Sequence, residues 1–167
     1  MARGMQTLEA VEVLDAFGLP YFRELATLGA LSDDAILWML QQGLIERIDA
    51  GRRITRFGEA SSAFHIVLEG KTAFYKRHGK RDVLTRYFES GDQIGFDLMI
   101  GLIPHNGTDV VEEESIILTI EVSLFQDFQE NFPADFGLLI INLARELSRE
   151  IALLEDVIVQ MDAATAE

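Results

Sequence analysis

The chain of 167 residues has the length of one domain, and its 49% apolar and 25% charged residues are typical of a folded globular protein. It contains no cysteine, which excludes disulfides, thiol chemistry and cysteine-held zinc or iron–sulfur sites. The net charge is −14, and residues 109–167 hold 14 acids but only Arg145 and Arg149 as bases, so direct DNA binding there is disfavoured. No apolar run reaches the ~18 residues of a membrane span and no secretory signal opens the chain, so we expect a cytoplasmic protein without membrane insertion.

The chain is expected to begin with helices. Apolar residues recur at three-residue intervals from Leu8 to Phe17, with acids between them, which predicts an amphipathic helix over residues 7–17. Residues 21–28 can form a further turn or two. Ser32 offers an N-cap for a helix over residues 35–42 that ends at Gly43. We assign residues 1–31 to an N-terminal helical segment.

From Leu44 onward, short apolar stretches alternate with charged residues and glycines, which is typical of strands. A hairpin tip is expected at His78-Gly79-Lys80. Strands are expected over residues 63–69, 72–77, 82–88 and 115–122. Their near-regular spacing predicts a small β-roll or barrel, assigned with a following short helix to residues 32–132.

A long helix is predicted from Pro133 to Met161 and is assigned, with a short tail, to residues 133–167. Apolar side chains recur in it with the a/d spacing of a coiled coil, which favours a parallel two-stranded coil and a homodimer. Alternatively, the same face packs on the chain's own β-domain. The seam consists of Ala144, Leu147, Ile151, Leu154, Ile158 and Met161.

The segment Gly91-Asp92-Gln93-Ile94-Gly95 stands at the centre of the predicted roll. Two glycines four residues apart allow a tight turn that exposes backbone N–H groups as a possible anion nest. This segment is therefore the first candidate for a phosphate-binding loop.

The order of elements, the run from Phe64 to Gly70 and the segment Gly91–Gly95 together resemble the cyclic-nucleotide-binding domain of the catabolite-activator type, over about residues 20–160. The resemblance implies an α+β fold: a β-roll (a double-stranded β-helix, jelly-roll-like) flanked by N-terminal helices and a long C-terminal dimerisation helix. It also implies a phosphate-binding cassette, whose counterparts here are Gly91, Asp92, Gly95, Phe96, Asp97, His105, Asn106, Gly107 and Thr108.

The cassette departs from the family pattern at the residues that contact the ligand. The family continues after the second glycine with Glu for the ribose hydroxyl, whereas Phe96 follows here and Asp97 comes one step late. The family then supplies Arg for the cyclic phosphate, where His105 or Asn106 stands here. A buried phosphate without a charged partner costs several kcal/mol, and a protonated His105 would be a weak replacement. The usual binding of cyclic AMP or cyclic GMP is therefore not expected.

On the long helix, Glu150 and Ile151 occupy the places where some family members present hydroxyls to the base, which is a further departure. The family's transcription factors carry a helix-turn-helix domain after this helix. Here the sequence ends at Glu167, so we expect a stand-alone domain that does not read DNA in that manner.

These observations predict a non-enzymatic regulatory or sensor-like protein that acts through protein–protein contacts, without a cofactor. No metal site is expected, because His65, His78 and His105 lie on separate segments. The alternative is a receptor for a cyclic nucleotide or another small molecule through a non-standard pocket. Such a ligand would be recognised by Asp97, His105, Asn106 and Thr108. An enzyme is disfavoured because no nucleophile–base pair is evident, although Asp97 and His105 could do acid–base work if adjacent.

Overall fold

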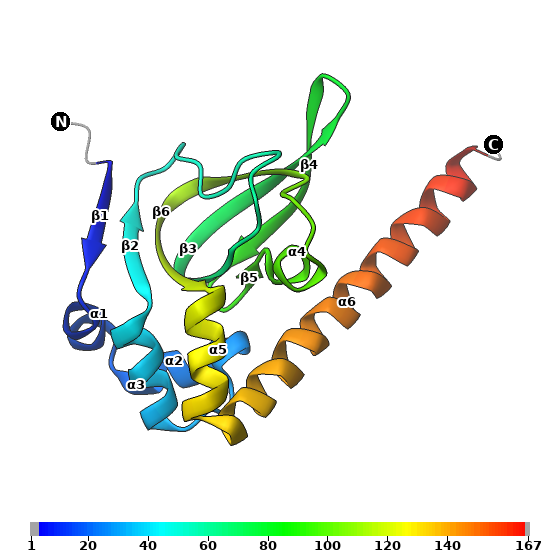
Figure 1. The fold of residues 1–167 in the computed structure, drawn as a ribbon. Coiled ribbons are helices and arrows are strands. Elements are labelled where there is room, and N and C mark those ends of the chain that lie inside the picture. The colour runs from blue at the N-terminus through cyan, green and yellow to red at the C-terminus, as the bar shows by residue number, and fades with distance from the viewer. Residues whose placement is uncertain (1–3, 166–167) are drawn as a thin grey trace.

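A computed structural model describes residues 4–165. Its centre is one antiparallel sheet of six strands in the order β1-β2-β6-β3-β4, with the short β5 paired to β3 (Figure 1). The strands are β1 (Met5–Leu8), β2 (Leu44–Ile48), β3 (Ala63–His78), β4 (Arg81–Glu89), β5 (Gln93–Ile94) and β6 (Gly107–Glu121). The long strands β3 and β6 pair from Ala63 with Glu121 to Lys76 with Gly107. This pair forms the central part of the roll.

The expectation of two separate strands over residues 63–69 and 72–77 is wrong, because β3 is continuous through both. Gly70, with φ of 103°, lies where the register between β3 and β6 shifts instead of at a strand end. The backbone N–H of Lys71 donates to Ser115 Oγ at 3.0 Å, which satisfies a donor that the shifted ladder leaves open. The irregularity therefore bends the strand without ending it.

Short helices cover one end of the sheet, and a long helix extends from it (Figure 1). The helices are α1 (Ala10–Phe17), α2 (Leu19–Glu24), the 3-10 turn η1 (Ala26–Leu28), α3 (Asp33–Gln42), α4 (Phe96–Gly101), α5 (Val122–Asn131) and α6 (Pro133–Thr165). Ser32 caps α3 as expected, its Oγ accepting from the N–H of Ala35 at 3.3 Å. The first helix starts later than predicted, since residues 5–8 pair with β2 as β1. A capping box between Glu9 and Glu12 fixes its start.

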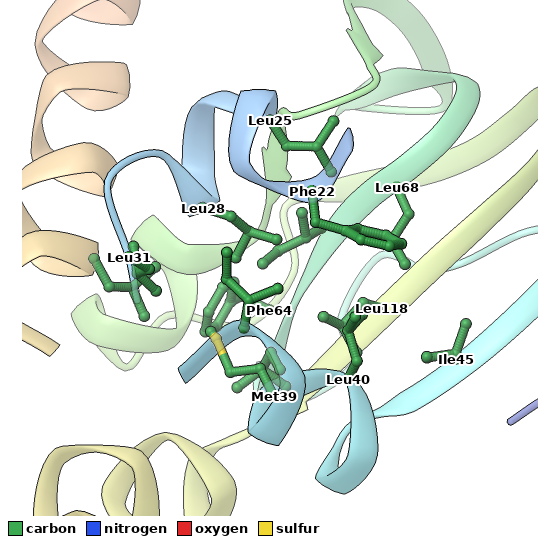
Figure 2. Packing of buried hydrophobic residues seen from close by; sticks show 14 of the residues in the cluster. Phe22, Leu25, Leu28, Leu31, Met39, Leu40, Ile45, Phe64, Leu68 and Leu118 are labelled. Atoms are coloured by element: carbon green, nitrogen blue, oxygen red, sulfur yellow. The ribbon is translucent and has the colours of Figure 1, made fainter. Parts of the chain in front are cut away.

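The main core lies between the sheet and the helices, and side chains from α2, η1, α3, β3 and β6 meet there (Figure 2). Phe22, Leu28 and Phe64 are fully buried in it, and each such side chain stabilises the fold by roughly 1.5–3 kcal/mol. Leu139 and Leu143 bring the first half of α6 into the same core. The fold is thus the predicted α+β one, with an antiparallel sheet, N-terminal helices and a long C-terminal helix. None of the described helices is long and apolar enough to cross a membrane.

Helix α6 is anchored near its beginning. Asp135 accepts hydrogen bonds from the N–H and hydroxyl of Ser32, at 2.6 and 3.0 Å. Asn142 Nδ2 donates to the carbonyls of Thr27 and Gly29 at 3.2 and 2.7 Å, which ties the helix to η1. From Ile151 to Ala164 every residue is exposed, and the helix runs out past the sheet (Figure 1).

Candidate functional site

A cavity of about 530 Å³ lies between the inner face of the roll and α6. Its size is that of a small-molecule pocket, for which ~300–1,000 Å³ is usual. Its polar wall comes from Lys76, Thr85, Arg86, Gln93, Asp97, Asn106, Asp109 and Glu150. Its apolar wall comes from Phe74, Phe88, Ile94, Leu98, Leu153, Leu154 and Val157.

The loop that begins at Gly91 is bonded to the protein itself at its first residue. The N–H of Gly91 donates to the carbonyl of Val67 at 2.8 Å, and the carbonyl of Gly91 accepts from the N–H and the hydroxyl of Thr27 at 3.2 and 2.7 Å. Its φ is 96°, and a Cβ at this position would lie 2.9 Å from the backbone N of Ala26. Gly91 therefore joins the roll to η1 and lies outside the cavity wall.

The next residues of the loop also serve the fold. Asp92 Oδ2 accepts from the N–H of Glu89 at 2.8 Å. Gln93 is buried, and its Oε1 accepts from the N–H of Phe96 at 2.9 Å, at the start of α4. This contact occupies the first N–H of a helix whose exposed N–H groups would otherwise be candidates for an anion. Gly95 alone of the two loop glycines lines the cavity.

The residues after the loop are divided between core and cavity. Phe96 is 5% exposed and packs in the core against the rings of Phe64 and Phe125, with centroids 5.5 and 5.9 Å apart. It therefore does not fill the pocket. Asp97 and Asn106 both line the cavity.

His105, Gly107 and Thr108 lie outside the cavity wall. His105 is buried behind Gly95, and its backbone N–H donates to the carbonyl of Glu59 at 2.9 Å. Burial lowers the pKa of His105 despite the carboxylates of Glu59 and Asp97, so this side chain is a poorer cation than a free imidazole. Gly107 packs against Phe74, and Thr108 lines a separate hollow of about 180 Å³.

Arg86 and Asp109 are charged residues of the cavity that the sequence analysis did not identify. Arg86 projects from β4 over the ring of Phe88, 4.3 Å from its centroid, and forms an ion pair with Glu150 of α6. Burial lowers the pKa of Arg86, and the opposing effect, which raises it, comes from the carboxylates of Asp92, Glu146, Asp97 and Asp109. The two-residue period of a strand places Arg86 on the same face as buried Phe88. This alternation could have identified Arg86 as an inward-facing residue from the sequence.

Asp109 of β6 is the most enclosed acid of the cavity, with 2% of its surface exposed. The hydroxyl of Thr55 donates to its Oδ2, and its own N–H donates to that hydroxyl at 3.1 Å. Its Oδ1 has no hydrogen-bond partner among the described residues. Burial raises the pKa of Asp109 to about 6, against the opposing effects of Thr55 and Arg86.

Glu146 of α6 lies beside this site and is also buried. Its Oε1 lies 2.9 Å from the hydroxyl of Thr27, which is 2.7 Å from the carbonyl of Gly91. A hydroxyl donates only one hydrogen bond, so the carboxylate of Glu146 and the carbonyl of Gly91 compete for the hydrogen of Thr27. Burial raises the pKa of Glu146.

The charges around Arg86 are therefore predominantly negative. Glu150 pairs with it directly, and four further carboxylates act on it. Within residues 4–165, no group of His, Asp and Glu side chains is arranged to hold a metal ion. The site is thus an acidic cavity in which the partly buried Arg86 is already paired.

The architecture is that of a cyclic nucleotide-binding domain, as comparison with solved structures shows. The chain matches a cyclic nucleotide-binding domain from Methylobacillus flagellatus with a TM-score of 0.78 and 15% identity, covering 93% of this chain and 88% of that one. It matches the catabolite activator protein of Thermus thermophilus with a TM-score of 0.67 and 18% identity, covering 84% of this chain and 63% of that one.

A third match is the regulatory subunit of a cAMP-independent protein kinase A from Trypanosoma cruzi bound to guanosine. Its TM-score is 0.65 at 18% identity, over 81% of this chain and 46% of that one. No protein-family model and no curated protein sequence matches the chain. At these identities the comparisons show the fold, and the ligand must be argued from the cavity itself.

Proposed function

We propose that the protein is a non-catalytic regulatory domain whose cavity does not bind cyclic AMP or cyclic GMP in the manner usual for its fold. The observation that carries this proposal is the state of Arg86, which is paired with Glu150 and surrounded by further carboxylates. The regulatory role is supported by the fold, which the neighbours named above use in an activator and a kinase regulatory subunit.

A cyclic phosphate would meet two obstacles in this cavity. It would have to replace Glu150 at Arg86, which leaves that carboxylate without its partner. It would also lie in a cavity lined by Asp97 and Asp109, and two like charges at 4 Å repel by roughly 4 kcal/mol at an effective dielectric constant of 20. The amide groups of the glycine loop offer little in return, since the carbonyls of Val67 and Glu89 accept from Gly91 and Asp92.

Calorimetric titration with cyclic AMP and cyclic GMP tests this. We expect dissociation constants weaker than ~1 mM for both nucleotides. Glu150→Gln should strengthen binding, because it frees Arg86 and removes a negative charge, whereas Glu155→Gln on the exposed part of α6 should not. Micromolar affinity of the unaltered protein would contradict the proposal.

A second candidate, a receptor for a different small molecule, is favoured by the cavity and by the unpartnered oxygen of Asp109. Asp97 and Asn106 from the alternative set lie on its wall, while His105 and Thr108 do not. The two candidates are compatible, because a regulatory domain can respond to such a ligand.

We further propose a homodimer formed through α6 as a parallel coiled coil. Ile151, Leu154, Ile158 and Met161 are at least 59% exposed, so the chain's own domain leaves most of the predicted seam uncovered. The alternative of intramolecular packing accounts for Leu147, which contacts the core, and in part for Leu154, which lines the cavity. A partner helix would cover apolar surface that is otherwise in water.

The double change Ile151→Glu with Ile158→Glu tests the dimer. Both residues occupy the first (a) position of the heptad, are exposed and do not contact the core. We expect light scattering to give the mass of a monomer, because two charges per helix would be buried in the seam. Ala152→Glu with Val159→Glu places the same charges, also seven residues apart, on another face and should leave the mass unchanged. A dimer that survives the first pair of changes excludes this seam.

A further inference from the structure

We propose that the cavity binds a small organic cation, with an N–H donor placed on Asp109 and an apolar body against α6 and the roll. This inference rests on the proposal that the cavity is a receptor site, and it names the chemical class of the ligand. Four observations lead to it: a free acceptor, the charge of the wall, the apolar surface and the volume.

The free acceptor is Asp109 Oδ1. Asp109 belongs to the lining of the cavity, and Thr55 holds its side chain in place through the other oxygen, Oδ2. Oδ1 has no hydrogen-bond partner among residues 4–165, although it is almost completely buried. A carboxylate oxygen accepts hydrogen bonds, and a buried one without a donor is costly. The group that completes this site is therefore a hydrogen-bond donor.

The charge of the wall favours a donor that is positively charged. The lining carries the cations Lys76 and Arg86 against the carboxylates of Asp97, Asp109 and Glu150, which leaves one negative charge in excess. Glu150 already neutralises Arg86. A monocation would balance the remaining charge, whereas an anion would double the excess.

The apolar surface and the volume require an organic ligand. Leu98 of α4, Ile94 of β5 and Phe88 of β4 line the cavity together with Leu154 and Val157 of α6. A volume of about 530 Å³ is far more than an ammonium or metal ion fills. A protonated amine on a body of one or two rings, or on an aliphatic chain, satisfies both the carboxylate and this surface.

The test compares ligands that share a body and differ in charge. Calorimetry and amide NMR spectra are recorded with tryptamine, indole-3-propionate, phenethylamine, 3-phenylpropionate and neutral guanosine. We expect each amine to bind about tenfold more tightly than its carboxylate partner and to shift the signals of β6 and of the cavity face of α6.

Asp109→Asn supplies the matched variant. It should weaken amine binding about tenfold, because it removes the charge but keeps the side-chain shape. Asp127→Asn, an exposed carboxylate on α5, should leave binding unchanged. Unfolding curves of both variants establish that they are folded.

Three results would overturn the inference: tighter binding of the carboxylates or guanosine, amine binding that is insensitive to Asp109→Asn, or no shift in the cavity with any amine. None of these would affect the prediction of weak cyclic nucleotide binding. Conversely, micromolar binding of cyclic AMP would contradict the proposed function while the comparison of amines with carboxylates could still be made.

Discussion

Asp109→Asn is expected to make the protein more stable at neutral pH, although Asp109 is a buried and hydrogen-bonded residue. Burial raises the pKa of Asp109 from 3.8 to about 6. Holding this carboxylate ionised in the folded state then costs on the order of 2–3 kcal/mol at pH 7.5, since one pKa unit corresponds to about 1.4 kcal/mol. Asparagine has nearly the same shape, keeps an oxygen for the hydroxyl of Thr55 and carries no charge.

The pH dependence gives the sign of this effect. Because the folded-state pKa of Asp109 is raised, the folded state binds the proton more tightly, and stability falls as pH rises from about 4 to about 6. His65 acts in the opposite direction: burial, with a smaller effect of His105, lowers its pKa to about 4, so stability rises with pH from about 4 to 6.5. The two opposing slopes partly cancel in the unaltered protein.

Urea unfolding between pH 4 and pH 8 measures the free energy of unfolding of Asp109→Asn and of the unaltered protein. The advantage of Asp109→Asn should be largest above pH 7 and become small at pH 4, close to the pKa of 3.8 of the unfolded state, below which Asp109 is protonated in both states. Its stability should therefore rise with pH more steeply than that of the unaltered protein. Asp127→Asn is the control for a carboxylate in water. A loss of stability in Asp109→Asn at pH 7.5 would show that the ionised carboxylate is better compensated than its surroundings indicate.

Gly91→Ala is expected to destabilise the protein by roughly 2–4 kcal/mol. Alanine would have to adopt φ of 96°, and its Cβ would lie 2.9 Å from the backbone N of Ala26, which cannot rotate away. The same loop carries the hydrogen bonds to Thr27 and Val67, so a shift of the backbone would disturb these as well.

Gly51→Ala is the matched control for Gly91→Ala. Its φ is 84°, but a Cβ there meets nothing within 4 Å, so only the cost of the backbone conformation remains. We expect a loss of about 1 kcal/mol, on the scale of 1–2 kcal/mol for a left-handed residue. The difference between the two free energies of unfolding isolates the contact with η1. Equal losses would show that the loop can move away from η1 without cost.

Most of the fold could be predicted from the sequence because its signals are local, but the pairing of β1 with β2 and the continuity of β3 could not. The glycine spacing, the Ser32 cap and the period of the long helix each specify an element from neighbouring residues. The wall of the cavity depends on contacts between distant segments. The ion pair of Arg86 with Glu150 joins β4 to α6, and the enclosure of Asp109 needs Thr55 from an irregular stretch. No spacing within the chain indicates these contacts.

Phe96 illustrates the same limit. Its place after Gly95 suggested a ligand contact by analogy with the family's Glu. In the structure, α4 begins at Phe96, directly after Gly95 at φ of 82°, and the ring lies in the core with Phe64 and Phe125. The free energy gained by burying the aromatic ring determines that the side chain of Phe96 points into the core. This gain depends on core residues that are distant in the sequence.

The anchoring of α6 near Asn142 has a mechanical consequence. From Glu150 to Thr165 the helix extends about 23 Å at 1.5 Å per residue, and beyond the cavity it has the stiffness of a rod. A tilt of about 10° at the level of Glu150 would carry its tip about 4 Å sideways. A ligand in the cavity would contact Leu153, Leu154 and Val157, which follow Glu150 in α6. In the proposed dimer, a small shift at Arg86 and Glu150 would therefore become a larger displacement at the contact with the second chain.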